Sequence, residues 1–140
     1  MSDVVIALDV GDARIGVARG ELGSRFAFGR GHLARSDTAH DVAAVKRIVE
    51  REGAVRVVVG LPQRTDGSDS PQTKRVRKFA RALERQGLEV CFEDERFTTQ
   101  LAGRHLLASE VPKRKRREKG RLDEAAAVLI LESYLQRSKE

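Results

Sequence analysis

The sequence predicts an α/β domain in which helices cover a mixed five-stranded sheet. Strand-length apolar runs joined by short turns open the chain, and apolar strand segments then alternate with amphipathic helical segments. A length of 140 residues suits one ordinary domain with its own core. We therefore expect a single domain, residues 1–140, with three antiparallel strands followed by parallel strands.

The first strands are predicted to form a hairpin or a three-stranded meander. Val4 to Leu8 is a continuous apolar run, and Arg14 to Ala18 follows it after a turn at Gly11 and Asp12. A third strand is expected near Phe26 to Leu33. Short connections of this kind favour antiparallel pairing.

A helix and a central strand come next. Apolar residues recur at helical spacing from about Thr38 to Glu52, and Thr38 with Asp41 resembles a capping box. Val55 to Val59 is apolar apart from Arg56, which is typical of a parallel strand that is buried on both faces.

The last third of the chain continues this alternation. The stretch Gly67 to Pro71 is predicted to be a loop and the start of a helix, which has one apolar face and a strongly positive remainder over Lys74 to Arg85. Leu88 to Phe92 alternates as a fifth strand. Further helices are expected near Leu101 to Leu106 and from Leu122 to about Gln136.

One short segment carries the whole charge excess. Residues 112–121 hold seven basic residues and one acid, which equals the net charge of +6. The segment has no apolar face to bury, so we expect a flexible basic loop or a frayed helix end. It is either a solvated run of charge or a binding site for a polyanion.

Other features of the composition narrow the class of protein. A single cysteine, Cys91, excludes an internal disulfide framework. No stretch approaches ~18 consecutive apolar residues, and the N-terminus lacks the pattern of a secretory signal. We expect a cytoplasmic protein with no membrane partner.

Three carboxylates fall where strand and helix ends should meet. Asp9 closes the first apolar strand, Glu95 closes the fifth, and Asp123 opens the final helix on its apolar face. Open sheets with parallel strands gather functional groups at the carboxyl ends of those strands, so we expect the acids to converge. Alternatively, Asp9 caps the following turn and Asp123 interacts with the helix N-terminus. Glu95, beside two other acids, could equally be solvated.

Converging carboxylates repel one another unless a cation neutralises them. Oxygen ligands select Mg²⁺ or Mn²⁺, and the sequence offers no His/Cys cluster for zinc. His32, His40 and His105 are scattered and are expected to be surface or packing residues.

Four motifs together resemble the YqgF/RuvX family of RuvC-like nucleases. The resemblance spans nearly the whole chain in the family's order. The motifs are Asp9-Val10-Gly11-Asp12-Ala13-Arg14-Ile15-Gly16-Val17-Ala18, Gly60-Leu61-Pro62 with Asp66-Gly67-Ser68, Asp94-Glu95-Arg96-Phe97-Thr98-Thr99, and Asp123 with Ala125-Ala126 and Ile130-Leu131-Glu132-Ser133-Tyr134-Leu135.

The resemblance implies a ribonuclease H-like fold and a two-metal-ion nuclease with Asp9, Glu95 and Asp123 as catalytic and metal-binding residues. The strand that ends at Gly60 carries no acid, unlike its counterpart in RuvC resolvases, and whether Asp94 contributes stays open. Family members are assigned to processing of pre-16S ribosomal RNA, including maturation of its 5′ end, or to Holliday-junction resolution. The sequence does not separate these two functions.

The expected partner is structured RNA or branched DNA, bound by a monomer or a homodimer. Arg14 and Arg96 could hold phosphate oxygens or pair with the acids, and Thr98 and Thr99 are expected to cap a helix. The predicted nucleic-acid contacts are Arg14, Arg96, Lys74, Arg77, Lys78, Arg81, Lys113, Arg114, Lys115, Arg116, Arg117, Lys119 and Arg121.

Two other functions remain open from the sequence. The Asp-x-Gly hairpin also occurs in actin-like ATPases, but those pair two such domains around a nucleotide, and this chain has room for one. A non-catalytic RNA- or ribosome-binding module would use the same basic surface. A base-stacking platform is disfavoured because the chain has no Trp and one Tyr.

Overall fold

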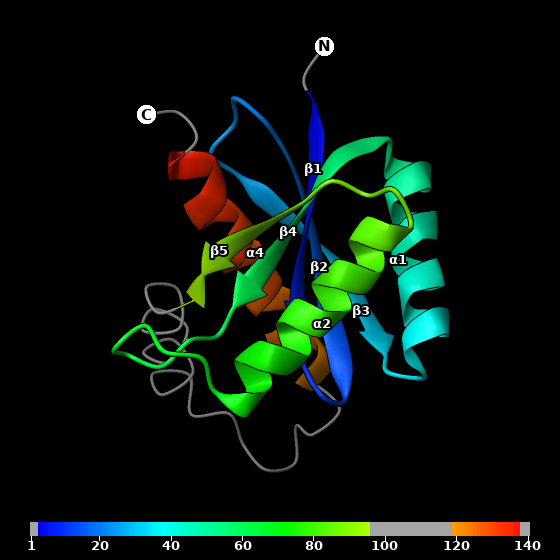
Figure 1. The fold of residues 1–140 in the computed structure, drawn as a ribbon. Coiled ribbons are helices and arrows are strands. Elements are labelled where there is room, and N and C mark those ends of the chain that lie inside the picture. The colour runs from blue at the N-terminus through cyan, green and yellow to red at the C-terminus, as the bar shows by residue number, and fades with distance from the viewer. Residues whose placement is uncertain (1–2, 96–118, 138–140) are drawn as a thin grey trace.

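The computed structural model describes residues 3–95 and 119–137. Within them lies a five-stranded sheet with the order β3-β2-β1-β4-β5 (Figure 1). β1, β2 and β3 pair antiparallel, whereas β4 is parallel to β1 and β5 is parallel to β4. The predicted mixed sheet is confirmed. The strands are β1 Val4–Val10, β2 Arg14–Glu21, β3 Ala27–Ala34, β4 Ala54–Leu61 and β5 Val90–Asp94.

Helices cover both faces of this sheet. Helices α1 (Thr38–Glu52) and α2 (Pro71–Arg85) lie on one face, and α4 (Lys119–Arg137) lies across the other (Figure 1). In the described part of the chain, no helix is both long and apolar enough to cross a membrane.

The pleat divides each strand between two cores. On β1, Ile6 and Leu8 pack under α1 and α2, whereas Val5 and Ala7 pack under α4. The same alternation sends the side chain of Asp9 to the α4 face. The face that carries α4 is therefore the face on which the candidate catalytic acids lie.

Glycines bring α4 very close to the sheet. A Cβ atom on Gly16 of β2 would lie 1.9 Å from the backbone oxygen of Asp123, and one on Gly29 of β3 would lie 2.4 Å from the carboxylate of Glu124. No real Cβ atom tolerates such distances. The absence of side chains at these positions thus sets the height of α4 above β2 and β3.

Both helices on the opposite face begin where the sequence predicted, but the N-terminal cap of α1 differs from the prediction. The N-cap of α1 is Asp37, whose side chain accepts a hydrogen bond from the backbone N–H of His40. The predicted box of Thr38 with Asp41 is wrong, because Asp41 is buried and binds Arg35 instead. α2 begins at Pro71, within the segment Gly67 to Pro71 that the sequence predicted as loop and helix start, and a capping box of Ser70 with Thr73 precedes it.

The final helix also begins earlier than expected. α4 starts at Lys119, so the last three residues of the basic segment 112–121 belong to a helix end and not to a loop, and residues 112–118 lie outside the described part. Asp123 is therefore the fifth residue of the helix, not its opening residue, and the first turn contains no acid. The helix predicted near Leu101 to Leu106 also lies outside the described residues.

Candidate active site

Two of the predicted acids meet at the carboxyl edge of the parallel strands. Asp9 lies near the end of β1, and Glu95 directly follows β5, with β4 between them. Their side chains are hydrogen-bonded to each other. A contact between two carboxyl groups requires a shared proton, so one member of the pair is the donor.

The surroundings of the pair raise the pKa of both groups. The pKa of Glu95 is raised to about 8, chiefly by burial of its carboxyl group. The charge of Asp9, the hydrogen bond to Asp9 and the charge of Asp94 raise it further, in that order. Burial and the charge of Asp123 raise the pKa of Asp9 to about 6, while the hydrogen bond with Glu95 lowers it. Burial and the repulsion between the two charges therefore favour one proton shared by the pair at neutral pH.

The third acid lies nearby but has a different partner. Nε of Arg14 donates a hydrogen bond to Oδ2 of Asp123 over 2.7 Å, and both side chains are partly buried. Asp123 still acts on Asp9 through its charge. The structure thus brings Asp9 and Glu95 into contact, whereas nearby Asp123 is ion-paired with Arg14.

The donor set can be tested against a metal ion. Within residues 3–95 and 119–137, no three His, Cys, Asp or Glu side chains are arranged so as to hold one. At this site the carboxylate of Asp123 is bound to Arg14. Asp9 and Glu95 nevertheless fit a hard divalent cation, because both supply carboxylate oxygens. In the metal-free protein the shared proton reduces the repulsion between the two carboxylates, and a bound cation would do the same.

The acids before Glu95 have separate environments. Glu93 is fully buried on the α4 face, where its carboxylate accepts hydrogen bonds from Ser133 (2.7 Å) and Arg137. Sequence reasoning missed this contact, although the strand alternation that places Glu95 toward α4 places Glu93 there as well. Asp94, between them in the strand, reaches the site through its charge on Glu95.

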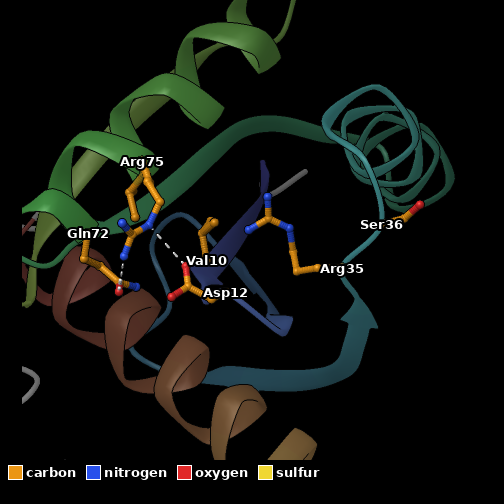
Figure 2. Close-up of a pocket in the computed structure, with 7 residues that line it drawn as sticks. Val10, Asp12, Arg35, Ser36, Gln72 and Arg75 are labelled. Atoms are coloured by element: carbon orange, nitrogen blue, oxygen red, sulfur yellow. Dashed lines mark hydrogen bonds and ion pairs between the residues drawn. The ribbon is translucent and has the colours of Figure 1, made fainter.

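A small polar pocket of about 130 Å³ adjoins the same end of β1 on the opposite face of the sheet. Figure 2 shows Gln72 and Arg75 extending from α2 toward Asp12 in the hairpin turn, with Nε of Arg75 3.3 Å from Oδ1 of Asp12. Arg35 lines the other side and donates to the backbone oxygen of Gly11. These contacts connect the turn after Asp9 to α2 and to the segment after β3.

The predicted nucleic-acid contacts on α2 fall into two groups. Lys74, Lys78 and Arg81 are exposed, and none of them forms an ion pair within the described part of the chain. Arg77 differs, because its Nε donates to Oδ2 of Asp69 over 2.9 Å and its guanidinium lies 5.7 Å from the ring centre of Phe92. Among the predicted contacts on α2, the charge without an ion pair in the described part is therefore carried by the other three residues.

The remaining predicted contacts are only partly described. Arg121 is exposed in the first turn of α4, and Lys119 begins that helix. Arg96, with Thr98 and Thr99, and the basic residues Lys113, Arg114, Lys115, Arg116 and Arg117 lie outside the described residues.

The architecture defines a ribonuclease H-like α/β protein with a pair of acids at the carboxyl edge of its parallel strands. The chain belongs to the RuvX family: the family model, described as a Holliday junction resolvase, matches residues 3–137.

Curated relatives named as nucleases match this chain over nearly their full lengths. A Thermus thermophilus protein named "Putative pre-16S rRNA nuclease" is 53% identical over 131 residues, which cover 94% of this chain and 96% of the relative. The Deinococcus radiodurans protein named "Ribonuclease YqgF" is 47% identical over 133 residues, covering 95% of this chain and 88% of the relative.

Solved structures show the same fold at low sequence identity. Thermus thermophilus RuvC, in complex with a Holliday junction substrate, matches with a TM-score of 0.60 and 17% identity and covers 96% of each chain. Fowlpox virus resolvase, in complex with Holliday junction DNA, matches with a TM-score of 0.53 and 14% identity and covers 98% of this chain and 99% of the resolvase. The predicted ribonuclease H-like fold is confirmed.

Proposed function

We propose that this protein is a divalent-cation-dependent nuclease that hydrolyses phosphodiester bonds in pre-16S ribosomal RNA. The observation that carries the proposal is the Asp9–Glu95 pair, two carboxyl groups in contact inside a protein of net charge +6. Burying two acids together costs folding free energy, so the pair serves chemistry and not stability. The names of the relatives supply the substrate.

Asp9, Glu95 and Asp123 are the proposed catalytic residues and ligands of Mg²⁺ or Mn²⁺. Two bound cations would supply an activated water on one side of the scissile phosphate and stabilise the leaving oxygen on the other. Asp9 and Glu95 would be the primary ligands, and a bound cation would stabilise the charged forms of both carboxyl groups, so that their shared proton would be released to solvent. Asp94 contributes the charge that favours cation binding beside Glu95.

Arg14 has two roles in this proposal. In the structure it holds Asp123, and its guanidinium keeps donors that can bind a nonbridging phosphate oxygen. A substrate phosphate that engages Arg14 competes with Asp123 for it. Substrate binding then frees the third carboxylate for the metal site, so the two events are coupled.

The unpaired basic surface is the proposed path for the nucleic-acid backbone. It includes Lys74, Lys78 and Arg81 on α2 and continues into a groove of about 710 Å³ between α1 and α2, which Lys46, Arg47 and Arg85 line. This surface lies on the face of the sheet opposite α4 (Figure 1). A nucleic acid that reaches both the acids and this surface must pass around the carboxyl edge of the sheet, which favours long or folded substrates over short single strands. The segment from Lys113 to Arg117 adds charge to the same footprint.

A second candidate function is Holliday-junction resolution. The description of the matching family model favours it. A third outcome, a non-catalytic RNA- or ribosome-binding module, would use the basic surface without the acids. We further propose that the protein acts in the cytoplasm, as a single domain and as a monomer or homodimer.

The experiment compares cleavage of a pre-16S RNA fragment, a single strand and a four-way DNA junction under identical conditions with Mg²⁺, Mn²⁺ or EDTA. Preferential cleavage of the RNA precursor supports the proposal, and preferential cleavage of the junction supports the second function. Asp9→Asn should lower the rate by about a thousandfold or more, since metal-ion catalysis contributes several kcal/mol.

The matched control is Asp12→Asn. It makes the same charge change three residues away, in an exposed side chain. Its rate should stay near that of the wild type. Cleavage in EDTA, or undiminished cleavage by Asp9→Asn, contradicts the proposal, and binding without any cleavage indicates the non-catalytic module.

A further inference from the structure

Asp9 has a glycine beside it on each neighbouring strand. On β2 its register partner is Gly16, and on β4 the pairing of Leu8 with Val59 places Gly60 next to it. The other two acids approach Asp9 across these same positions: the backbone of Asp123 lies over Gly16, and the side chain of Glu95 lies over Gly60.

Glu95 has a long distance to cover. Adjacent strands lie about 4.8 Å apart, so β1 and β5, which flank β4, are separated by roughly 10 Å. The side chain of Glu95 therefore reaches Asp9 only by lying across β4. A Cβ atom on Gly60 would lie 2.9 Å from Cδ and 3.0 Å from Cγ of Glu95, so any side chain there would occupy the path of this carboxylate.

The backbone itself does not require glycine at this position. Gly60 lies within the regular strand β4 and does not have a positive φ, unlike Gly23, Gly31 and Gly53. Space is the remaining reason, and two neighbours need it. Besides Glu95, Cδ1 of Ile130 on α4 would lie 2.5 Å from the added atom.

We infer that Gly60 is a positioning residue, whose missing side chain opens the passage through which Glu95 reaches Asp9. The inference rests on the proposed function, because it assigns the metal-binding role of that pair. It also accounts for how an acid beyond the end of β5 joins the site although β4 carries no acid of its own.

When Gly60 is replaced, the side chain of Glu95 should move and the backbone of β4 should stay in place. β4 is held on both sides by pairing with β1 and β5, whereas Glu95 stands at the end of its strand with a side chain that can rotate. Gly16 is the opposite case, since its added Cβ would meet the helix backbone. A methyl group at Gly60 should thus move the carboxylate away from Asp9 and leave the domain folded.

The experiment separates the two neighbours of Gly60. Ile130→Val removes the Cδ1 atom that would collide, so the pair Ile130→Val and Gly60→Ala/Ile130→Val differ mainly in the contact with Glu95. Crystal structures of both variants, Mn²⁺ affinity by calorimetry, and the kcat and KM of cleavage are measured together with the melting temperature.

We expect Ile130→Val to keep the contact of Glu95 with Asp9 and the Mn²⁺ affinity of the wild type. The double variant should fold, lose that contact, bind Mn²⁺ at least about tenfold more weakly, as changes that misplace ligands do, and lose kcat with KM for nucleic acid unchanged. A purely structural role would lower the melting temperature and leave the affinity of the folded protein unchanged. That result, or an Asp9–Glu95 contact that persists in the double variant, overturns the inference.

Failure of the proposed function would give a different result. If the wild type neither cleaves nucleic acid nor binds Mn²⁺, the crystal structures still show whether Gly60→Ala displaces Glu95. Displacement without metal binding keeps the steric role of Gly60 and removes its catalytic meaning.

Discussion

The two faces of the sheet differ in the size of the side chains that they present to the helices. Under α1 and α2 the strands present large aliphatic residues, such as Ile6, Leu8 and Ile15, and these join Phe79 and Leu83 in one core. Under α4 the strands present alanines, valines and glycines, and the helix approaches so closely that added Cβ atoms would collide with it. The first face mainly buries large apolar side chains. The small residues on the second face fix how closely α4 packs on the sheet.

Polar contacts reinforce the difference. α4 is tied to the sheet by Asp123 with Arg14, by Ser133 and Arg137 with Glu93, and by the Tyr134 hydroxyl, which accepts from Arg56. Its acids also reach the edge strand, where Glu124 accepts a hydrogen bond from the backbone N–H of Gly31. A buried hydrogen bond contributes about 1 kcal/mol and fixes a direction, which apolar burial does not. The face that carries the acids is therefore also the face whose register is specified by side-chain contacts.

Gly16→Ala should have the largest effect on stability. The added Cβ would lie 1.9 Å from the Asp123 backbone oxygen, and a helix backbone cannot rotate away as a side chain can. We expect a loss of about 3 kcal/mol or more in the free energy of unfolding, measured by urea denaturation.

Gly20→Ala is the matched control. Its added Cβ would meet the ends of the Leu135 and Leu131 side chains at 2.9 and 3.1 Å and the backbone oxygen of Phe26 at a longer 3.3 Å, so the loss should be about 1 kcal/mol. Equal losses in the two variants would show that the close approach of α4 near Asp123 carries no special cost.

Glu93→Gln tests the other end of α4. The substitution removes the charge that accepts hydrogen bonds from Ser133 and Arg137 in a buried position, and we expect a loss of about 2 kcal/mol. Glu89→Gln, which disrupts an exposed ion pair with Arg56, should cost less than about 1 kcal/mol. If both cost the same, the polar contacts under α4 do not specify its position.

The pH dependence of the metal-free protein follows from the acid pair. The folded-state pKa values of Asp9 and Glu95, about 6 and about 8, lie above their ordinary values of 3.8 and 4.5. Between these limits the folded state binds more protons than the unfolded state, so stability falls as pH rises. The melting temperature should decrease from pH 4 toward pH 8, and the decrease should be smaller in Glu95→Gln.

The carboxylates with lowered pKa values act outside that window. Asp37, Asp66 and Asp69 have pKa values below 3.8, so they add stability with rising pH only in more acidic solution. A melting temperature that rises between pH 5 and 8 would contradict a shared proton between Asp9 and Glu95.

Replacing the free cations of α2 should leave stability nearly unchanged. In Lys74→Gln/Lys78→Gln/Arg81→Gln three exposed charges without ion pairs in the described part are lost, so unfolding should change by less than about 0.5 kcal/mol. Binding of nucleic acid should weaken for all sequences, and the slope of log affinity against log salt should flatten by up to about 2.7. Filter binding at several salt concentrations measures both.

A comparison variant distinguishes the two basic regions. Neutralising Lys113, Arg114, Lys115 and Arg116 together tests the other part of the predicted footprint, and it should also flatten the slope. Catalysis at saturating substrate should persist in both variants, because none of these residues belongs to the acid cluster. If only one variant changes the salt dependence, the footprint is confined to that region.

Much of the fold could be predicted from local patterns. The apolar runs of β1, β2 and β4 and the stripe of α2 are visible in the sequence, and the convergence of Asp9 with Glu95 follows from the rule for parallel strands. The start of α4 could not be predicted in this way. The helix begins with Lys119, Gly120 and Arg121, which lack the apolar spacing on which a helix assignment depends.

The finer geometry of the site depends on register and packing height, which single residues do not encode. Arg14 pairs with Asp123 because the missing side chain of Gly16 allows α4 to pack closely against β2. Glu95 reaches Asp9 because Gly60 has no side chain in its path across β4. Both glycines appear in the sequence as ordinary strand residues. Only the packing of α4 and the neighbouring strands reveals what their missing side chains allow.

The central claim is that the acids on the α4 face form a divalent-cation site, and Mn²⁺ binding measured by isothermal titration calorimetry tests it most directly. Wild type, Asp9→Asn and Asp12→Asn are titrated side by side at pH 8, close to the raised pKa of Glu95, where less free energy is needed to remove the shared proton than at neutral pH. We predict that wild type and Asp12→Asn bind Mn²⁺ alike and that Asp9→Asn does not bind it measurably. Equal binding by Asp9→Asn and the wild type would contradict the account.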